Sequence, residues 1–183
     1  DIEDLLQSGA DIPEPTVEAI NKNEKNEEKH VLGIEKELFT VATGEVIALT
    51  DVNDPVFSQK MMGDGFAVIP ATGEVTAPLS GKIVSVFPTK HAIGMQTAEG
   101  AEVLIHMGLD TVQMSQPAFE ILVSEGQEVV AGTTIAQMNL DAIKNEGKET
   151  TIIVVFTDDK VNGLTINKLG DTERGTVIGK INL

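Results

Sequence analysis

Two histidines that lie fifteen residues apart are the side chains of this sequence best suited to chemistry. His91 occurs in Pro88-Thr-Lys-His-Ala-Ile-Gly, and His106 occurs in Val103-Leu-Ile-His-Met-Gly-Leu-Asp-Thr-Val. Imidazole is a good nucleophile near neutral pH because its ordinary pKa is about 6.5. The pair is therefore compatible with a metal site, with an acid–base pair, or with a phosphoryl acceptor and a helper that hydrogen-bonds the phosphoryl oxygens. The third histidine, His30, lies in a polar segment and is expected to be a bystander.

The segment between the two histidines predicts a β-hairpin around the turn residues Ala98-Glu99-Gly100. With Glu99-Gly100 as a two-residue loop, His106 lies opposite Ile93 and is a diagonal neighbour of His91 on the same face. A loop centred on Ala98-Glu99 puts the histidines directly opposite each other. A three-residue loop puts them on opposite faces, so their convergence depends on the length of this loop.

The phosphoryl-acceptor interpretation fits these residues better than a metal site. A stable metal site usually needs a third protein ligand, and no motif next to either histidine supplies one. The candidates elsewhere in the sequence are Asp64 and Asp110. We therefore expect no metal, except one that a partner's ligand completes. Thr89 is placed to orient the helper ring of His91, and backbone N–H groups around Gly108 can bind phosphoryl oxygens.

Short runs rich in Val, Ile and Thr, separated by Gly and Pro, predict that nearly the whole domain is β-structure. So many short strands are typical of an antiparallel β-sandwich or barrel with a few short helical turns, such as Asp141–Asn145. The near-copies Thr43-Gly-Glu-Val and Thr72-Gly-Glu-Val suggest a duplicated β-motif, although reuse of hairpin turns explains them equally well. The predicted strands are Phe39–Val41, Glu45–Leu49, Phe66–Ile69, Lys82–Phe87, Val103–Met107, Ile121–Ser124, Thr133–Met138, Thr151–Thr157 and Thr176–Ile181.

Composition divides the chain and excludes several classes of function. Residues 1–30 are polar and acidic and are expected to be a linker or tether, with residues 31–183 as the domain. The net charge of −16 and the aromatic content of 3% argue against nucleic-acid binding. There is no cysteine, and no apolar run is long enough to span a membrane, so we expect a cytoplasmic protein. Because the chain begins at Asp1 without Met, we expect it to be part of a longer polypeptide.

Five motifs in the same order and spacing give the sequence a strong resemblance to the IIA domain of the glucose-superfamily sugar phosphotransferase systems. The resemblance covers about residues 34 to 183. The motifs are Val56-Phe-Ser-Gln-Lys-Met-Met-Gly-Asp-Gly65, Thr76-Ala-Pro-Leu-Ser-Gly-Lys-Ile83, Thr89-Lys-His91-Ala, Leu104-Ile-His-Met-Gly-Leu-Asp-Thr-Val112 and Glu125-Gly-Gln-Glu-Val129.

The resemblance implies a phosphotransferase component with a phosphohistidine intermediate and no cofactor. His106 would accept the phosphoryl group, His91 would stabilise it, and Thr89 would bond to His91. The donor would be the phosphocarrier protein HPr, and the recipient would be a cysteine of a IIB domain. A membrane IIC or permease domain, in the same polypeptide or a separate one, would transport a sugar whose identity this sequence does not reveal.

The resemblance also implies a docking face for these partners around the histidines. Its acidic members would meet a basic residue of the donor, and its apolar members would form a ring. Phe87 and Leu104 equally suit an ordinary core. The implied docking residues are Phe57, Met61, Phe87, Leu104, Val112, Asp54 and Asp110.

Three alternatives stay open at this point. A biotinyl- or lipoyl-like carrier domain shares the pattern of Gly turns and Val strands, but Lys90 lacks the usual flanking residues. A zinc peptidase on a related β-scaffold needs more histidines than the sequence offers. A regulatory module that responds to phosphorylation is compatible with phosphoryl carriage in the same chain.

Overall fold

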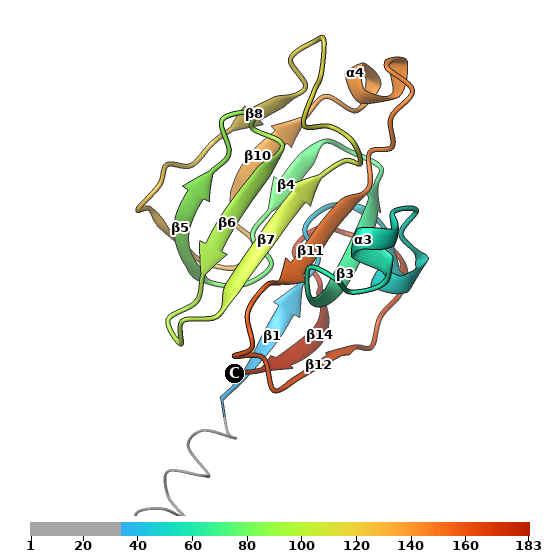
Figure 1. The fold of residues 1–183 in the computed structure, drawn as a ribbon. Helices are drawn as coiled ribbons and strands as arrows, with labels where there is room; N and C mark the ends of the chain where they lie inside the picture. The colour runs from blue at the N-terminus through green and yellow to red at the C-terminus, as the bar shows by residue number, and fades with distance from the viewer. Residues whose placement is uncertain (1–33) are drawn as a thin grey trace, which may run out of the picture. The chain divides into compact units, whose positions relative to one another are not determined.

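The computed structural model describes residues 34–183, and this part of the chain is almost entirely antiparallel β-structure (Figure 1). The strands form an eight-stranded sheet in the order β13-β2-β3-β11-β7-β6-β5-β9 and two three-stranded sheets in the orders β4-β10-β8 and β1-β14-β12. The predicted fold class, an antiparallel β-sandwich with short helices, is confirmed. The strands are β1 (Glu35–Phe39), β2 (Gly44–Ala48), β3 (Asp64–Pro70), β4 (Glu74–Thr76), β5 (Gly81–Val86), β6 (Ala92–Gln96), β7 (Glu102–Met107), β8 (Phe119–Ile121), β9 (Glu128–Val129), β10 (Thr134–Met138), β11 (Ile152–Phe156), β12 (Gly163–Ile166), β13 (Gly170–Thr172) and β14 (Val177–Asn182).

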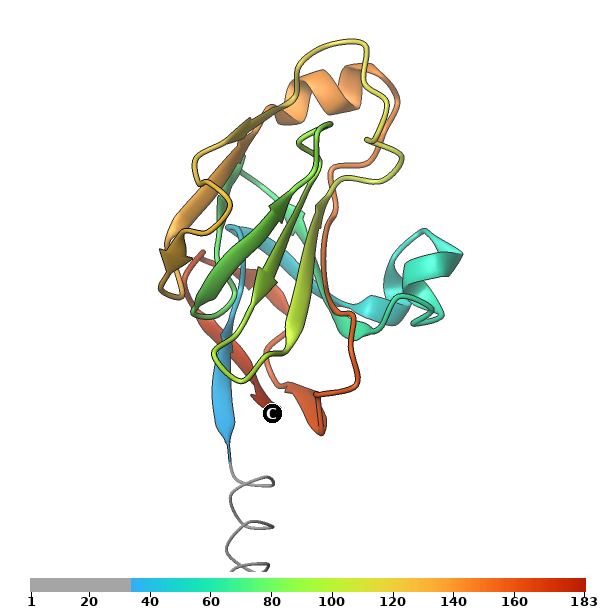
Figure 2. The same cartoon turned by 60° about the vertical axis from the view of Figure 1, so that its left-hand side comes forward.

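In the described part of the chain, three short helices interrupt the strands: η1 (Leu49–Asp51), α3 (Pro55–Ser58) and α4 (Leu140–Asn145). Helix α3 begins where Asp54 accepts a hydrogen bond from the backbone N–H of Val56 and Pro55 occupies the first turn. Figure 2 shows β8 and β10 on one side of the large sheet and α3 on the other. Within residues 34–183, no helix is long and apolar enough to cross a membrane.

Strand β11 lies at the centre of the large sheet, between β3 and β7. Its sequence, Ile-Ile-Val-Val-Phe, is apolar at every position, and all five residues are buried. A strand alternates its side chains between two faces, so a continuous apolar run indicates that both faces are covered. One face of β11 therefore packs into the main core, and the other needs a cover of its own.

That cover is a small hydrophobic cluster, which we call the α3 cluster. Ile153 and Val155 of β11 and Ala67 of β3 form its floor, and Phe57 of α3 packs over them. Leu49, Val52 and Leu109 complete the buried set, and Ile47 and Leu104 pack at its margin. A four-residue helix has little stability in isolation, so burial of Phe57 is what holds α3 against the sheet.

Most predicted strands are present, and their boundaries differ by a few residues. The predicted strand Phe39–Val41 is wrong in position, because β1 ends at Phe39. The predicted strand Ile121–Ser124 is also misplaced, because β8 ends at Ile121 and a turn follows. The predicted helical turn Asp141–Asn145 lies within α4, which Asn139 caps. The predicted linker at 1–30 and His30 lie outside the described residues.

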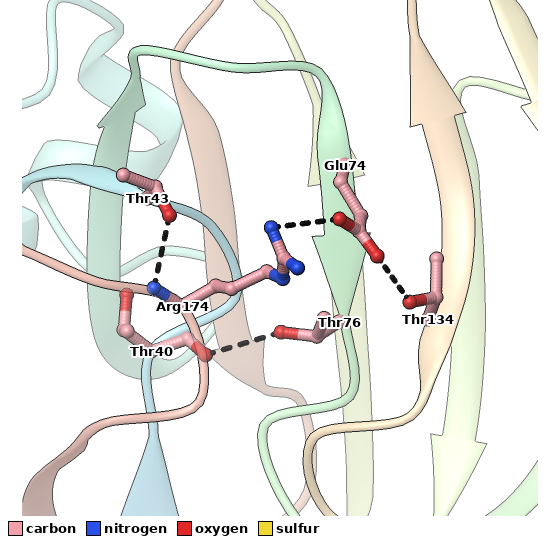
Figure 3. Close-up of polar contacts among 6 residues, drawn as sticks. All are labelled: Thr40, Thr43, Glu74, Thr76, Thr134 and Arg174. Atoms are coloured by element: carbon pink, nitrogen blue, oxygen red, sulfur yellow. Dashed lines mark hydrogen bonds and ion pairs between the residues drawn. The ribbon is translucent and has the colours of Figure 1, made fainter.

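The chain's single arginine ties the sheets together (Figure 3). Arg174 lies in the turn between β13 of the large sheet and β14 of a small one, and its Nη1 is 2.8 Å from Glu74 Oε2 on β4. Thr134 of β10 donates to the other oxygen of Glu74 at 2.5 Å. The Arg174 backbone N–H donates to Thr43 Oγ1 at 3.1 Å. The Arg174–Glu74 ion pair thereby connects the turn between β13 and β14 to β4, and so links segments from all three sheets.

Replacing Arg174 by Met should lower the free energy of unfolding by about 1 kcal/mol, the upper end of the range for surface ion pairs, because its partner Glu74 is held by a second hydrogen bond. Lys180→Met removes the more exposed pair between Lys180 and Glu35 and should cost about 0.5 kcal/mol or less. Urea denaturation of both variants measures the two values. Equal losses would contradict the proposed role of Arg174.

Candidate functional site

His106 lies on β7, on the face of the large sheet that carries the α3 cluster. Its cross-strand neighbours are Ala92 on β6 and Ile153 on β11, and Ile153 belongs to the floor of that cluster. The Phe57 ring packs beside it, with ring centroids 5.1 Å apart. The imidazole of His106 therefore lies half-buried at the margin of an apolar patch.

The rings of His91 and His106 meet, with centroids 4.9 Å apart and planes nearly perpendicular at 82°. Phe87 packs edge-on against His91 from the far side, at 5.6 Å between centroids. Four rings thus form a row in the order Phe87, His91, His106 and Phe57. The predicted convergence of the two histidines is present in the structure.

Neither of the two loops that would bring the histidines together by strand pairing is present in the structure. The β6–β7 loop has three residues, because Thr97 pairs with Ala101 and its hydroxyl accepts from the Ala101 N–H. His106 consequently lies opposite Ala92 and not opposite Ile93. A three-residue loop was expected to separate the histidines, but the side chain of His91, just before β6, does not follow the alternation of that strand.

A hydrogen bond to a backbone carbonyl sets the proton position on His106. Its Nδ1 lies 2.8 Å from the Gly108 carbonyl oxygen, which can only accept, so Nδ1 carries the hydrogen and Nε2 keeps a free lone pair. Gly108 has φ +85°, and a Cβ there would lie 2.4 Å from Thr111 Cγ2. Glycine is therefore required at this position both for its backbone conformation and for space.

Thr89 bonds to the other ring, as predicted. Its Oγ1 lies 2.5 Å from His91 Nδ1. When the threonine hydroxyl is the donor, Nδ1 is the acceptor and Nε2 of His91 carries the hydrogen. In that tautomer His91 offers an N–H donor, while His106 offers a lone pair.

Burial keeps both imidazoles neutral at physiological pH. Removal from water is the main cause that lowers the pKa of His106 to about 4, and the charge of the nearby His91 acts in the same direction, while the Gly108 carbonyl, Asp54 and Asp110 act in the opposite direction. Burial also lowers the pKa of His91, which is 6% exposed. An uncharged ring is the nucleophilic form, so this site favours attack by His106 on an electrophile.

Comparison with known proteins places this pair of histidines in a family. The family model described as phosphoenolpyruvate-dependent sugar phosphotransferase system, EIIA 1, matches residues 36–161, which include Thr89, His91 and His106. The chain belongs to this EIIA family. This membership favours the phosphotransferase interpretation over a biotinyl- or lipoyl-like carrier.

Individual relatives agree with the EIIA family model. The chain is 45% identical to the PTS system glucose-specific EIICBA component of Streptococcus pneumoniae, matching along its whole length but spanning only 25% of that protein. It is 46% identical to the PTS system glucose-specific EIIA component of Staphylococcus aureus over 66% of this chain and 73% of that one. The solved glucose permease IIA from Mycoplasma capricolum superimposes with a TM-score of 0.76 and 37% identity, covering 81% of this chain and 96% of the other.

The predicted docking residues of this EIIA chain differ in exposure. Met61, Val112 and Phe87 are exposed, Asp110 is exposed, and Asp54 and Leu104 are half-buried. Phe57 is instead 7% exposed and is the central residue of the α3 cluster, so it supports the site from below. Sequence analysis missed Val56 and Met62, which are also exposed on and beside α3. Both residues lie in the same sequence motif as Met61, and this could have identified them as further docking residues.

The candidate third metal ligands do not join the histidines. Within residues 34–183, no group of three His, Cys, Asp or Glu side chains is arranged to hold a metal ion. Asp110 acts on His106 only through its charge, and Asp64 is engaged with Lys60 and with the Gly65 N–H.

The lowered pKa of His106 should make stability depend on pH. Between pH 6.5 and about 4 the unfolded chain binds a proton that folded His106 does not, so the free energy of unfolding falls as the pH falls through this interval. His106→Gln removes this contribution, so its urea midpoint should change less than that of the parent chain. A proton NMR titration of the His106 ring with a midpoint near 6.5 would contradict the assignment.

Proposed function

We propose that this EIIA chain is a phosphoryl carrier of a bacterial sugar phosphotransferase system, with His106 Nε2 as the acceptor atom. The observation that carries the proposal is the free Nε2 lone pair of a neutral His106, held 4.9 Å, between ring centroids, from a second imidazole. Membership in the EIIA family supports the reaction class.

The transfer step follows from the tautomer. Nε2 of His106 attacks the phosphorus of a phosphohistidine on the donor; the new N–P bond forms as the donor's N–P bond breaks, and the donor ring keeps the released electron pair. The His106 ring becomes positively charged because Nδ1 retains its hydrogen. The Gly108 carbonyl, Asp54 and Asp110 stabilise this charge, since each favours the cationic ring. Onward transfer to a thiolate returns the ring to its neutral state.

His91 and Thr89 act on the phosphoryl group and not on the nucleophile. With Thr89 donating to Nδ1, the Nε2–H of His91 donates to a phosphoryl oxygen and offsets its negative charge. The flanking Phe87 and Phe57 rings limit the rotation of the imidazoles and the access of water. Exclusion of water slows hydrolysis of the phosphohistidine before it reaches the next carrier.

The proposed partners are the phosphocarrier HPr as donor and a cysteine of a IIB domain as recipient. Relatives named EIICBA are consistent with IIB and a membrane IIC domain, either in one polypeptide with this domain or separate. Residues 1–30 would then be a tether and residues 31–183 the IIA domain, on the cytoplasmic side of the membrane. Sugar choice would belong to the membrane partner, since the relatives include glucose-specific and glucoside-specific systems.

Docking would use the surface around the histidine row. Met61, Phe87 and Val112 supply exposed apolar area at a site where most large apolar side chains are otherwise buried. Leu104 is half-buried and packs against the α3 cluster, to which Phe57 belongs. Asp54 and Asp110 give the surface a negative charge suited to a basic donor surface.

Three substitutions test the roles of the site residues. His106→Gln should abolish labelling by radiolabelled phospho-HPr. His91→Gln should still be labelled, but it should pass phosphate to IIB roughly a hundredfold more slowly, because the donor to the phosphoryl oxygens is lost. Thr89→Val should show a smaller defect, of roughly tenfold. Label is followed through HPr, the variant and IIB by gel autoradiography, and full labelling of His106→Gln would refute the site assignment.

A second set of variants tests the docking surface. Met61→Lys and Val112→Lys place a cation where a basic donor surface should bind, and each should lower the rate constant for phosphorylation by HPr at subsaturating concentration by roughly tenfold. Val130→Lys is the matched control, because Val130 is 68% exposed and Met61 69%, and Val130 follows β9 at the sheet edge. Equal effects at Met61 and Val130 would argue against this surface.

A further inference from the structure

The loops around the histidine pair contain every non-glycine residue at positive φ within residues 34–183. These are Lys60, just after α3, Lys90, just before His91, and Asp110, in the loop after β7, with φ values of 59°, 62° and 58°. Side chains larger than glycine rarely adopt this left-handed conformation, because Cβ crowds the backbone. Such residues gather at sites whose geometry they help to hold.

His91 departs from the alternation that its neighbours obey. The Met107 N–H donates to the His91 carbonyl at 2.7 Å, so the β6–β7 ladder continues one residue beyond the paired Ala92 and His106. By strand alternation, His91 would share a face with Met107, whose fully buried side chain points away from the face of His106. Its ring instead lies against the ring of His106.

The turn before His91 supplies a cause. The Lys90 N–H donates to the Phe87 carbonyl at 2.7 Å, and the Phe87 N–H donates to the Ala92 carbonyl at 3.1 Å, so the chain reverses between these residues. Lys90 closes this turn in the left-handed conformation. A left-handed residue at the entrance to a strand re-aims the side chain that follows, as it does in β-bulges beside active sites.

We propose that Lys90 is a positioning residue whose left-handed backbone conformation turns the His91 ring onto the face of His106. Its side chain is exposed, and none of the ion pairs formed within residues 34–183 includes it, which is consistent with a role for the backbone and not for the ammonium group. The effect on phosphoryl transfer rests on the proposed function; the effect on ring geometry does not.

The test is a graded series at one position in the full chain: Lys90→Gly, Lys90→Asn, Lys90→Ala and Lys90→Val. All four lack the amine, and they differ in how readily they adopt positive φ: Gly and Asn adopt it readily, Ala less so, and the β-branched Val least. The readouts are the nuclear Overhauser contact between the His91 and His106 ring protons and the rate of transfer from phosphorylated chain to IIB. Lys60→Val is the matched control, with the same substitution at the same backbone conformation in another loop.

The Gly and Asn variants should keep the ring contact and transfer near the parent rate. Ala should weaken both, and Val should lose the contact and slow transfer by roughly tenfold to a hundredfold, because misplacing a catalytic group by about 1 Å can cost a factor of that order. Lys60→Val should lose stability in urea without losing the ring contact. If Lys90→Val fails to fold, the same test rests on Lys90→Ala, whose ring contact and transfer rate should both be weaker than those of Lys90→Gly.

Two results would overturn the proposal. A ring contact that is equally weak in Gly and Val would assign the effect to the lost amine, and a contact that persists in Ala and Val would remove any role for the backbone of Lys90. Failure of phospho-HPr to label the parent chain would instead refute the proposed function. The ring contacts across the series would still decide whether Lys90 positions His91.

Discussion

The hydrogen bond from His106 Nδ1 to the Gly108 carbonyl is the contact on which the chemistry of the site depends. It selects one of two neutral tautomers and thereby decides which ring nitrogen would accept the phosphoryl group in the proposed function. The carbonyl is held in turn by the backbone around it. The Gly108 N–H donates to the Thr151 carbonyl at 2.8 Å, and Thr111 Oγ1 donates to the Met107 carbonyl at 2.6 Å. The proton position on one imidazole is therefore set by backbone geometry and not by a titrating neighbour.

The site balances burial against charge. Apolar contact with Phe57 and the rest of the α3 cluster takes His106 out of water and keeps it neutral, which suits a nucleophile. The same burial would disfavour the cationic ring of a phosphohistidine if nothing opposed it. Asp54, which caps the N-terminus of α3, and Asp110, in the loop after β7, oppose this effect through their charge. The proposed acceptor thus lies in a setting that tolerates both its uncharged and its charged form.

Sequence patterns predicted the strands that have apolar runs and missed those without them. β11 and β7 were found because their runs of Val and Ile are long, whereas β12 and β13, Gly-Leu-Thr-Ile and Gly-Asp-Thr, have too few apolar residues to stand out from turns. The histidine pair was found, but the sequence left three lengths open for the loop between β6 and β7, because loop length depends on the Thr97 contacts. Whether Phe57 is exposed or buried depends on what α3 packs against, and that surface includes β11, which is far from α3 in the sequence, as well as the neighbouring strand β3.

The floor beneath the reactive ring comes from the far end of the domain. Ile153 and Val155, on which Phe57 packs, follow His106 by more than forty residues in the sequence. A ribosome extends the chain from its N-terminus, so a nascent polypeptide exposes β6 and β7 before β11 has been synthesised. Until then the imidazole has neither its apolar support nor the Thr151 carbonyl that anchors Gly108. On the proposed function, competence to carry a phosphoryl group on His106 is consequently acquired late in translation, once β11 has been synthesised.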